Sequence, residues 1–113
     1  FVENYKQVLI VLKKNILNLN YQDKSLIIEK NIFTNFNFNL LENKFDIIFM
    51  DPPYKEEKIS ILLNKINDAN VLKSEGIIII HRHKREKDEF PKEFNILEVK
   101  TYGMSKIIFG NYI

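Results

Sequence analysis

Two predominantly apolar runs constrain what this chain can fold into more than any other feature. FDIIFM (45–50) and GIIII (76–80) each have the length of one strand, and neither shows the polar alternation of a half-exposed strand. Runs of this kind are typical of parallel strands that are covered on both faces. Pro52 and Pro53 end the first run, because proline cannot donate to a strand ladder.

Helical periodicity separates these runs. Apolar residues spaced three and four apart predict helices over about 4–19 and 56–69. Weaker patterns predict the remaining elements: short strands at 1–3 and 25–30, a short helix within 32–43, loops at 71–76 and 81–93, and a closing hairpin of 94–102 and 105–113 around Gly103. Alternating strands and helices predict an α/β open sheet with helices on its faces.

Composition excludes few functions. The 113 residues predict one domain, and an apolar content of 45% and a charged content of 28% are ordinary for a globular protein. The absence of cysteine rules out disulfides and thiolate metal ligands. No segment has the pattern of a secretory signal or a membrane span, so we expect a soluble, cytoplasmic protein. We also expect a monomer. A net charge of +2 neither demands nor excludes nucleic acid as a partner.

Asp51-Pro52-Pro53-Tyr54 follows the first apolar run, and ligands of open α/β sheets bind beyond the carboxyl ends of strands. Two prolines fix two φ angles, which makes a stiff loop that holds a carboxylate, carbonyl groups and an aromatic ring in place. Such a loop suits a planar base with an amino group, which is gripped by edge hydrogen bonds and stacking. The alternative is a plain strand ending, which the buried strand before the loop disfavours.

DIIFMDPPY resembles motif IV, the [D/N/S]-P-P-[Y/F/W] loop of amino methyltransferases that depend on S-adenosylmethionine. With VLKSEGIIII and YGMSKIIFGNY, the chain most resembles the RsmD family of bacterial 16S rRNA guanine-N2 methyltransferases. The resemblance implies a Rossmann-like class I methyltransferase sheet that ends in an antiparallel strand pair. The partner it implies is 16S rRNA or a small-subunit assembly intermediate, and no metal is expected.

The resemblance makes four residues catalytic: Asp51, Pro52, Pro53 and Tyr54. Asp51 and the Pro52 carbonyl would hold the guanine amine, Pro53 would stiffen the loop, and Tyr54 would stack on the base. The motif is shared with DNA adenine-N6 and protein glutamine-N5 methyltransferases, which remain alternatives. A non-catalytic RNA-binding or structural remnant is an alternative of another class.

Glu3 and Asn31 are the candidate cofactor ligands. An acid at the end of a strand in a nucleotide-binding half can bond ribose hydroxyls, and the resemblance implies this role for Glu3. Glu3 can equally cap the helix that follows it. Asn31 stands where the family usually has an Asp near the cofactor's adenine, and its amide oxygen can accept a hydrogen bond. In this asparagine-rich chain, an ordinary turn is nearly as good an interpretation.

The basic segment HRHKRE (81–86) follows the second apolar run. Its functional interpretation is phosphate contact with rRNA through Arg82, Lys84 and Arg85. A solvated charged loop explains the same pattern equally well. His81 and His83 have no third ligand placed with them, so no metal site is predicted.

A Gly-rich loop after the first strand is expected in this class of methyltransferase, and it does not occur in these 113 residues. Gly76, Gly103 and Gly110 form no G-x-G pattern. Compared with the family, the chain begins at the second strand, so the resemblance makes it the C-terminal part of a single methyltransferase domain, 1–113. We therefore expect the intact parent to be the enzyme, and these residues alone to be inactive and to bind cofactor weakly.

Overall fold

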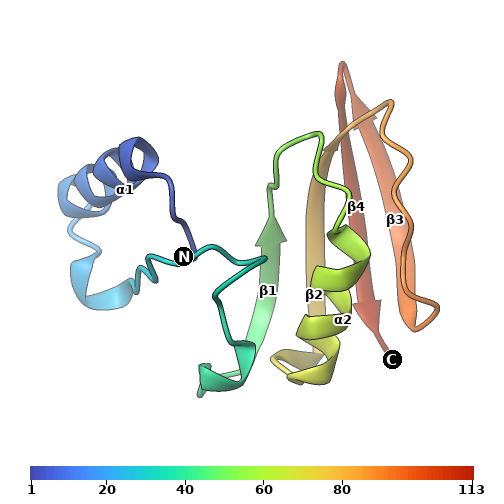
Figure 1. Ribbon diagram of the computed structural model, residues 1–113, viewed down its shortest axis with the longest axis horizontal. Coiled ribbons are helices and arrows are strands. Elements are labelled where there is room, and N and C mark those ends of the chain that lie inside the picture. The colour runs from blue at the N-terminus through green and yellow to red at the C-terminus, as the bar shows by residue number, and fades with distance from the viewer. The chain divides into compact units, whose positions relative to one another are not determined.

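The computed structural model describes residues 1–113, which form two compact units, Phe1–Asn37 and Phe38–Ile113 (Figure 1). The first unit contains helix α1 (Lys6–Asn18) and the 3-10 turn η1 (Gln22–Lys24). The second contains the remaining elements: η2 (Phe38–Leu40), β1 (Phe45–Met50), α2 (Ile59–Asp68), β2 (Leu72–His83), β3 (Phe94–Tyr102) and β4 (Ser105–Tyr112). Neither α1 nor α2 is long and apolar enough to span a lipid bilayer.

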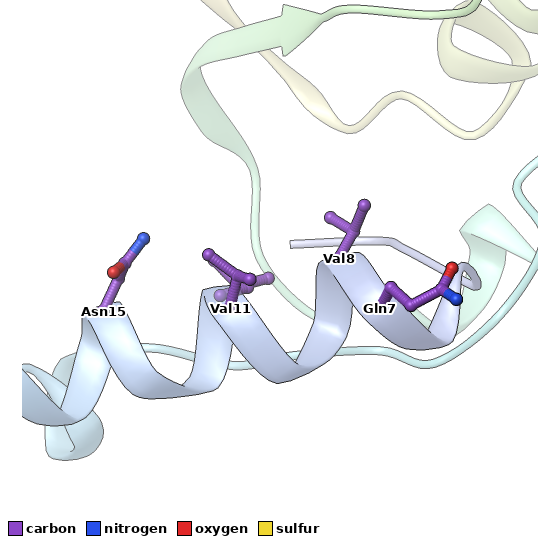
Figure 2. A pocket seen from close by; sticks show the side chains of 5 residues that line it. Gln7, Val8, Val11 and Asn15 are labelled. Atoms are coloured by element: carbon purple, nitrogen blue, oxygen red, sulfur yellow. The ribbon is translucent and has the colours of Figure 1, made fainter.

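Helix α1 lies within the predicted range and buries Leu9 and Ile16. The strands predicted at 1–3 and 25–30 are reduced to one parallel bridge between Val2 and Ile28, since neither segment has a second neighbour in this unit. On another face of α1 there is an open hollow (Figure 2), lined by Gln7, Val8, Val11, Leu12 and Asn15. These lining side chains are aliphatic or amide groups, so the hollow offers no ionisable group for catalysis.

The second unit is a four-stranded sheet in the order β1-β2-β4-β3. Strands β1 and β2 are parallel, and β4 is antiparallel to both β2 and β3. The predicted α/β class and the closing antiparallel pair are therefore confirmed. The hairpin turns at Gly103, whose φ of 56° lies in the left-handed region that glycine adopts without strain.

Helix α2 lies across one face of this sheet (Figure 1). Its apolar residues recur at helical spacing and are buried: Ile59, Leu62, Leu63 and Ile66. Ile78, Ile80 and Ile108 of the sheet are buried as well. Each such side chain contributes about 1.5–3 kcal/mol when fully buried. Asn70, with a φ of 52°, takes the left-handed conformation that commonly ends a helix.

Three sequence predictions are corrected here. Residues 71–76 are mostly strand, because β2 begins at Leu72 and carries Lys73 to Gly76 through a register shift against β1. The charged loop begins at residue 84 rather than 81, since β2 continues to His83. Strand β1 is not covered on both faces: Ile47 and Phe49 are each 62% exposed, because they alternate with the buried Met50 and so point to the opposite face of the sheet.

Candidate active site

The Asp51-Pro52-Pro53-Tyr54 loop leaves the sheet where β1 ends. Met50 pairs with Ile80 of the parallel strand β2, so the next residues, Asp51 and His81, emerge at the same edge. Asp51 Oδ1 lies 2.8 Å from His81 Nδ1. The other ring nitrogen, His81 Nε2, lies 2.9 Å from the Ser105 hydroxyl at the start of β4.

The contacts from Ser105 through His81 to Asp51 orient the Asp51 carboxylate. A carboxylate only accepts hydrogen bonds, so His81 Nδ1 carries the proton that points to Asp51. In the neutral ring Nε2 then accepts the Ser105 hydroxyl proton. The Asp51 side chain remains 58% exposed, so it keeps oxygen lone pairs for a donor from outside the protein.

The Tyr54 ring stands beside the two histidines of β2. Its centroid lies 5.9 Å from that of His81 and 5.4 Å from that of His83, with interplanar angles of 82° and 63°. Edge-to-face packing of this kind is favourable for aromatic rings. Because Tyr54 is still 45% exposed, part of its surface remains open to another planar group.

Arg82 lies behind the same loop with 1% of its surface exposed. Its Nη1 donates to the carbonyl of Pro53 at 3.0 Å, and its Nη2 donates to those of Tyr54 at 3.1 Å and Glu56 at 2.8 Å. Its Nε donates to Asp88 Oδ1 at 2.9 Å. The prediction that Arg82 contacts rRNA phosphates is therefore corrected, because this guanidinium is buried and bonded to the protein.

Lys84 and Arg85 have exposed side chains in the turn that follows β2. The backbone N–H of Lys84 donates to the Met104 carbonyl at 2.8 Å, and that of Arg85 donates to His83 Nδ1 at 3.2 Å. The turn is therefore anchored by its backbone while both cationic side chains face solvent. Their contact with RNA stays a prediction.

Glu3 and Asn31 belong to the first unit, where both make local bonds. Glu3 Oε1 accepts the backbone N–H groups of Asn4 and Tyr5, each at 2.8 Å, just before α1 begins. Asn31 Oδ1 accepts the backbone N–H of Phe33 at 2.9 Å. These bonds are the capping and turn roles that the sequence also allowed. The ribose and adenine roles of the two residues stay predictions.

The glycines of this chain do not fit the cradle that S-adenosylmethionine requires. Gly76 lies in β2 and Gly103 in the hairpin turn. Gly110 packs against the Phe94 ring, where an added Cβ would lie 2.2 Å from Phe94 Cζ. None of them opens a helix beyond a parallel strand, so these residues alone do not complete a cofactor site. No cluster of three or more His, Asp or Glu side chains is arranged to hold a metal ion.

Three side chains of the candidate site were not predicted from the sequence: the Ser105 hydroxyl, His81 as a partner of Asp51, and Asp88 as a partner of Arg82. The parallel register offered one signal, because it places the first residues after the two apolar runs side by side. No sequence pattern indicated Ser105 or Asp88, since both contacts form between segments that are distant along the chain.

Residues 1–111 match the model of a protein family described as conserved hypothetical protein 95. The chain is 31% identical over 74 residues to an uncharacterised methylase of Rickettsia prowazekii, covering 66% of this chain and 31% of that protein. It is 34% identical over 67 residues to the putative rRNA methyltransferase YlbH of Bacillus subtilis, covering 58% and 36%. It is 28% identical over 100 residues to ribosomal RNA small subunit methyltransferase D of Buchnera aphidicola, covering 88% and 51%. The chain thus spans about half or less of the length of these curated relatives.

Solved structures resemble this one over nearly its full length. A conserved hypothetical protein of Streptococcus pyogenes has a TM-score of 0.82 at 22% identity, covering 97% of this chain and 69% of that one. A putative methylase of Haemophilus influenzae has a TM-score of 0.77 at 24% identity, covering 100% and 71%. These likenesses establish the fold, an incomplete Rossmann-like methyltransferase sheet.

Proposed function

Because the chain belongs to the family of conserved hypothetical protein 95, which is an RsmD-like methyltransferase family, we propose that it is part of an rRNA methyltransferase. Residues 1–113 would form the C-terminal part of one methyltransferase domain. The methyl acceptor would be the exocyclic N2 amine of a guanine in 16S rRNA, free or in a small-subunit assembly intermediate. S-adenosylmethionine would supply an electrophilic methyl group when bound.

The observation that carries the proposal is the pairing of an oriented carboxylate with an open aromatic ring at one strand end. Asp51 is oriented by the 2.8 Å contact with His81, and Tyr54 is packed against both histidines of β2. Pro52 and Pro53 restrict the loop between them. A flat base with an amino group fits such an arrangement better than a substrate without a ring does.

We infer the following roles for the residues of this chain. Asp51 and the Pro52 carbonyl accept the N–H groups of the amine, which fixes the direction of the nitrogen lone pair. Tyr54 stacks on the guanine and holds it in the plane that these bonds require. Positioning and electrostatic stabilisation, rather than covalent chemistry by the protein, supply the rate gain. Lys84 and Arg85 contact phosphates beside the site.

A methyl-transfer assay with three acceptors tests the proposal. Radiolabelled S-adenosylmethionine is supplied with small-subunit rRNA, with DNA or with a release factor, and the modified residue is identified by mass spectrometry. The complete product of the gene is assayed beside the 113-residue chain. We expect label in guanine N2 of 16S rRNA with the complete product. Label in DNA adenine or protein glutamine would support those alternatives, and no label in any acceptor would support a non-catalytic remnant.

A further inference from the structure

The burial of the charged Arg82 side chain requires a physical explanation. Removing a guanidinium from water costs several kcal/mol unless its donors are satisfied and its charge is paired. Here the donors reach three backbone carbonyls, those of Pro53, Tyr54 and Glu56, within 2.8–3.1 Å. All three carbonyls lie in or directly after the Asp51–Tyr54 loop, so the loop is bonded to the side chain of a neighbouring strand.

The loop has few bonds of its own. Pro52 and Pro53 carry no N–H, so neither can close a turn as a donor. The backbone bond from the Glu56 N–H to the Pro53 carbonyl, at 2.9 Å, closes one turn after them. The forked guanidinium adds bonds to the carbonyls of Pro53, Tyr54 and Glu56 in a fixed geometry, which a lysine ammonium does not reproduce. Arg82 thus contributes more bonds to this stretch of backbone than the loop makes with itself.

Asp88 connects this fork to the charged segment 84–93, which follows β2. Its side chain is 4% exposed, and its Oδ1 lies 2.8 Å from Arg82 Nη2 and 2.9 Å from Arg82 Nε. Its Oδ2 has no hydrogen-bond partner, and the nearest cation is Lys106 Nζ at 3.9 Å. Lys106 Nζ also donates to the Glu86 carbonyl at 2.6 Å. One buried ion pair thus joins the backbone after Asp51 to the segment that begins with Lys84 and Arg85.

We propose that Arg82 and Asp88 are positioning residues that set the conformation of the Pro53–Glu56 backbone and couple it to segment 84–93. The consequence for catalysis rests on the proposed function. RNA that contacts Lys84 and Arg85 would touch the segment that Asp88 links, through Arg82, to the Tyr54 ring and the carbonyls beside the guanine. Arg82 itself touches neither RNA nor the amine, and it acts through the loop.

Backbone dynamics of the 113-residue chain test the positioning role without any activity. We compare ¹⁵N order parameters in the wild type, Arg82→Met, Asp88→Asn and the control Lys87→Met, which removes an exposed cation of the same segment. In the wild type and the control, the Tyr54 and Glu56 amides should have values near about 0.85, typical of rigid backbone. In both Arg82→Met and Asp88→Asn they should fall below about 0.6, while β4 amides keep their wild-type values.

Two results would overturn the positioning role. One is wild-type order parameters at Tyr54 and Glu56 in both variants. The other is an unfolded Arg82→Met chain combined with a rigid loop in Asp88→Asn, since the pair would then serve overall stability alone.

Kinetics of the complete gene product test the consequence for catalysis. A misplacement of about 1 Å costs about 10²-fold in rate, so Arg82→Met should lower kcat by about that factor and change the KM for rRNA far less. Methylguanidinium should restore part of the kcat of Arg82→Ala by filling the vacated site, and should leave Lys87→Met unaffected. An unchanged kcat in Arg82→Met, with methyl transfer by the wild type, would refute the coupling.

The two arms separate this inference from the proposed function. Loss of loop order in the variants together with no methyl transfer by the wild type would retain the positioning role and refute the methyltransferase proposal. Methyl transfer by the wild type, together with an ordered loop and full activity in Arg82→Met, would support the methyltransferase proposal and refute the positioning role.

Discussion

Asp51 is a surface residue whose side chain is linked to the fold by its contact with His81. Replacing it should therefore affect chemistry much more than stability. We expect Asp51→Ala in the complete gene product to lower kcat/KM by at least about 10²-fold, the usual cost of removing one group that positions or electrostatically stabilises the reacting atoms. The free energy of unfolding should change by less than about 1 kcal/mol.

The matched control for this variant is Asp46→Ala, which removes an exposed carboxylate from the same strand. Asp46 pairs with Lys73 at 2.9 Å and contacts none of the loop residues described above. Its removal should leave methyl transfer unchanged. Steady-state kinetics and urea denaturation measure both effects, and near-normal turnover by Asp51→Ala would refute the assignment.

Tyr54 makes a separate prediction, because stacking depends on the ring and not on the hydroxyl. Base–aromatic stacking contributes about 1–3 kcal/mol, so Tyr54→Ala should weaken binding of a short guanine-containing RNA by roughly 5- to 150-fold. Tyr54→Phe keeps the ring and should bind within about twofold of the wild type. Fluorescence anisotropy with labelled RNA measures the affinities. Equal affinity for the Ala and Phe variants would exclude stacking by this ring.

Helices and strands with a strong hydrophobic pattern were predictable from the sequence. Elements whose bounds depend on pairing with a distant strand were not. FDIIFM became β1, a strand as predicted, although most of its side chains are exposed. The spacing of Ile59, Leu62 and Ile66 predicted α2, because a helix buries these apolar side chains on one face. LKSEG looked like a loop, since its polar residues and glycine are rare in strands. It joins β2 because a register shift against β1 lets these residues bulge out of the ladder.

The candidate site likewise has features that the sequence predicted and others that it did not. The position of Asp51 and Tyr54 just after a strand was predictable, because the apolar run before them and the two prolines mark the strand end; their catalytic roles stay predictions. The role of Arg82 was not, since a basic run gives no information on which of its members is buried. Burial was decided by the alternation of β2, which points Arg82 to the α2 face beside Ile78 and Ile80, all three buried.

The contact between β4 and α2 predicts a response to alkaline pH. The Tyr112 hydroxyl donates to the Leu63 carbonyl at 2.8 Å. Partial burial, together with the carboxylates of Glu93 and Asp68, raises the pKa of Tyr112 well above its ordinary value of 10.0. Below pH 10 the group is neutral in both folded and unfolded chains, so it gives no pH dependence. Above pH 10 the unfolded chain loses this proton first, so the free energy of unfolding falls as pH rises.

Tyr112→Phe tests that response. The variant should lose about 1 kcal/mol at pH 7, the usual net value of one hydrogen bond, and its stability should fall less steeply above pH 10 than that of the wild type. Tyr102→Phe is the control, because Tyr102 is exposed and should leave the slope unchanged. Urea denaturation between pH 8 and pH 11 measures all three chains, and identical slopes in the wild type and Tyr112→Phe would contradict the assignment.

At the scale of the whole chain, the proposed base-holding loop at residues 51–54 is present, whereas no glycine of the chain forms a cofactor cradle. None of the three glycines forms a loop that cradles a nucleotide, and Glu3 and Asn31 are engaged in local bonds. We therefore expect the 113-residue chain to bind S-adenosylmethionine weakly or not at all by isothermal titration calorimetry. Micromolar affinity for this chain would contradict that expectation and would mean that other residues form the cradle.

The burial of Arg82 also bears on how such a sequence changes over generations. The chain contains 15 lysines and two arginines, so its basic positions are overwhelmingly lysine. An AGA arginine codon becomes an AAA lysine codon by one base change, and at an exposed position such as Arg85 that change alters little. At Arg82 it would replace a fork that bonds three carbonyls and a carboxylate with a single ammonium group. The bonds of the Arg82 side chain therefore select against lysine at this position.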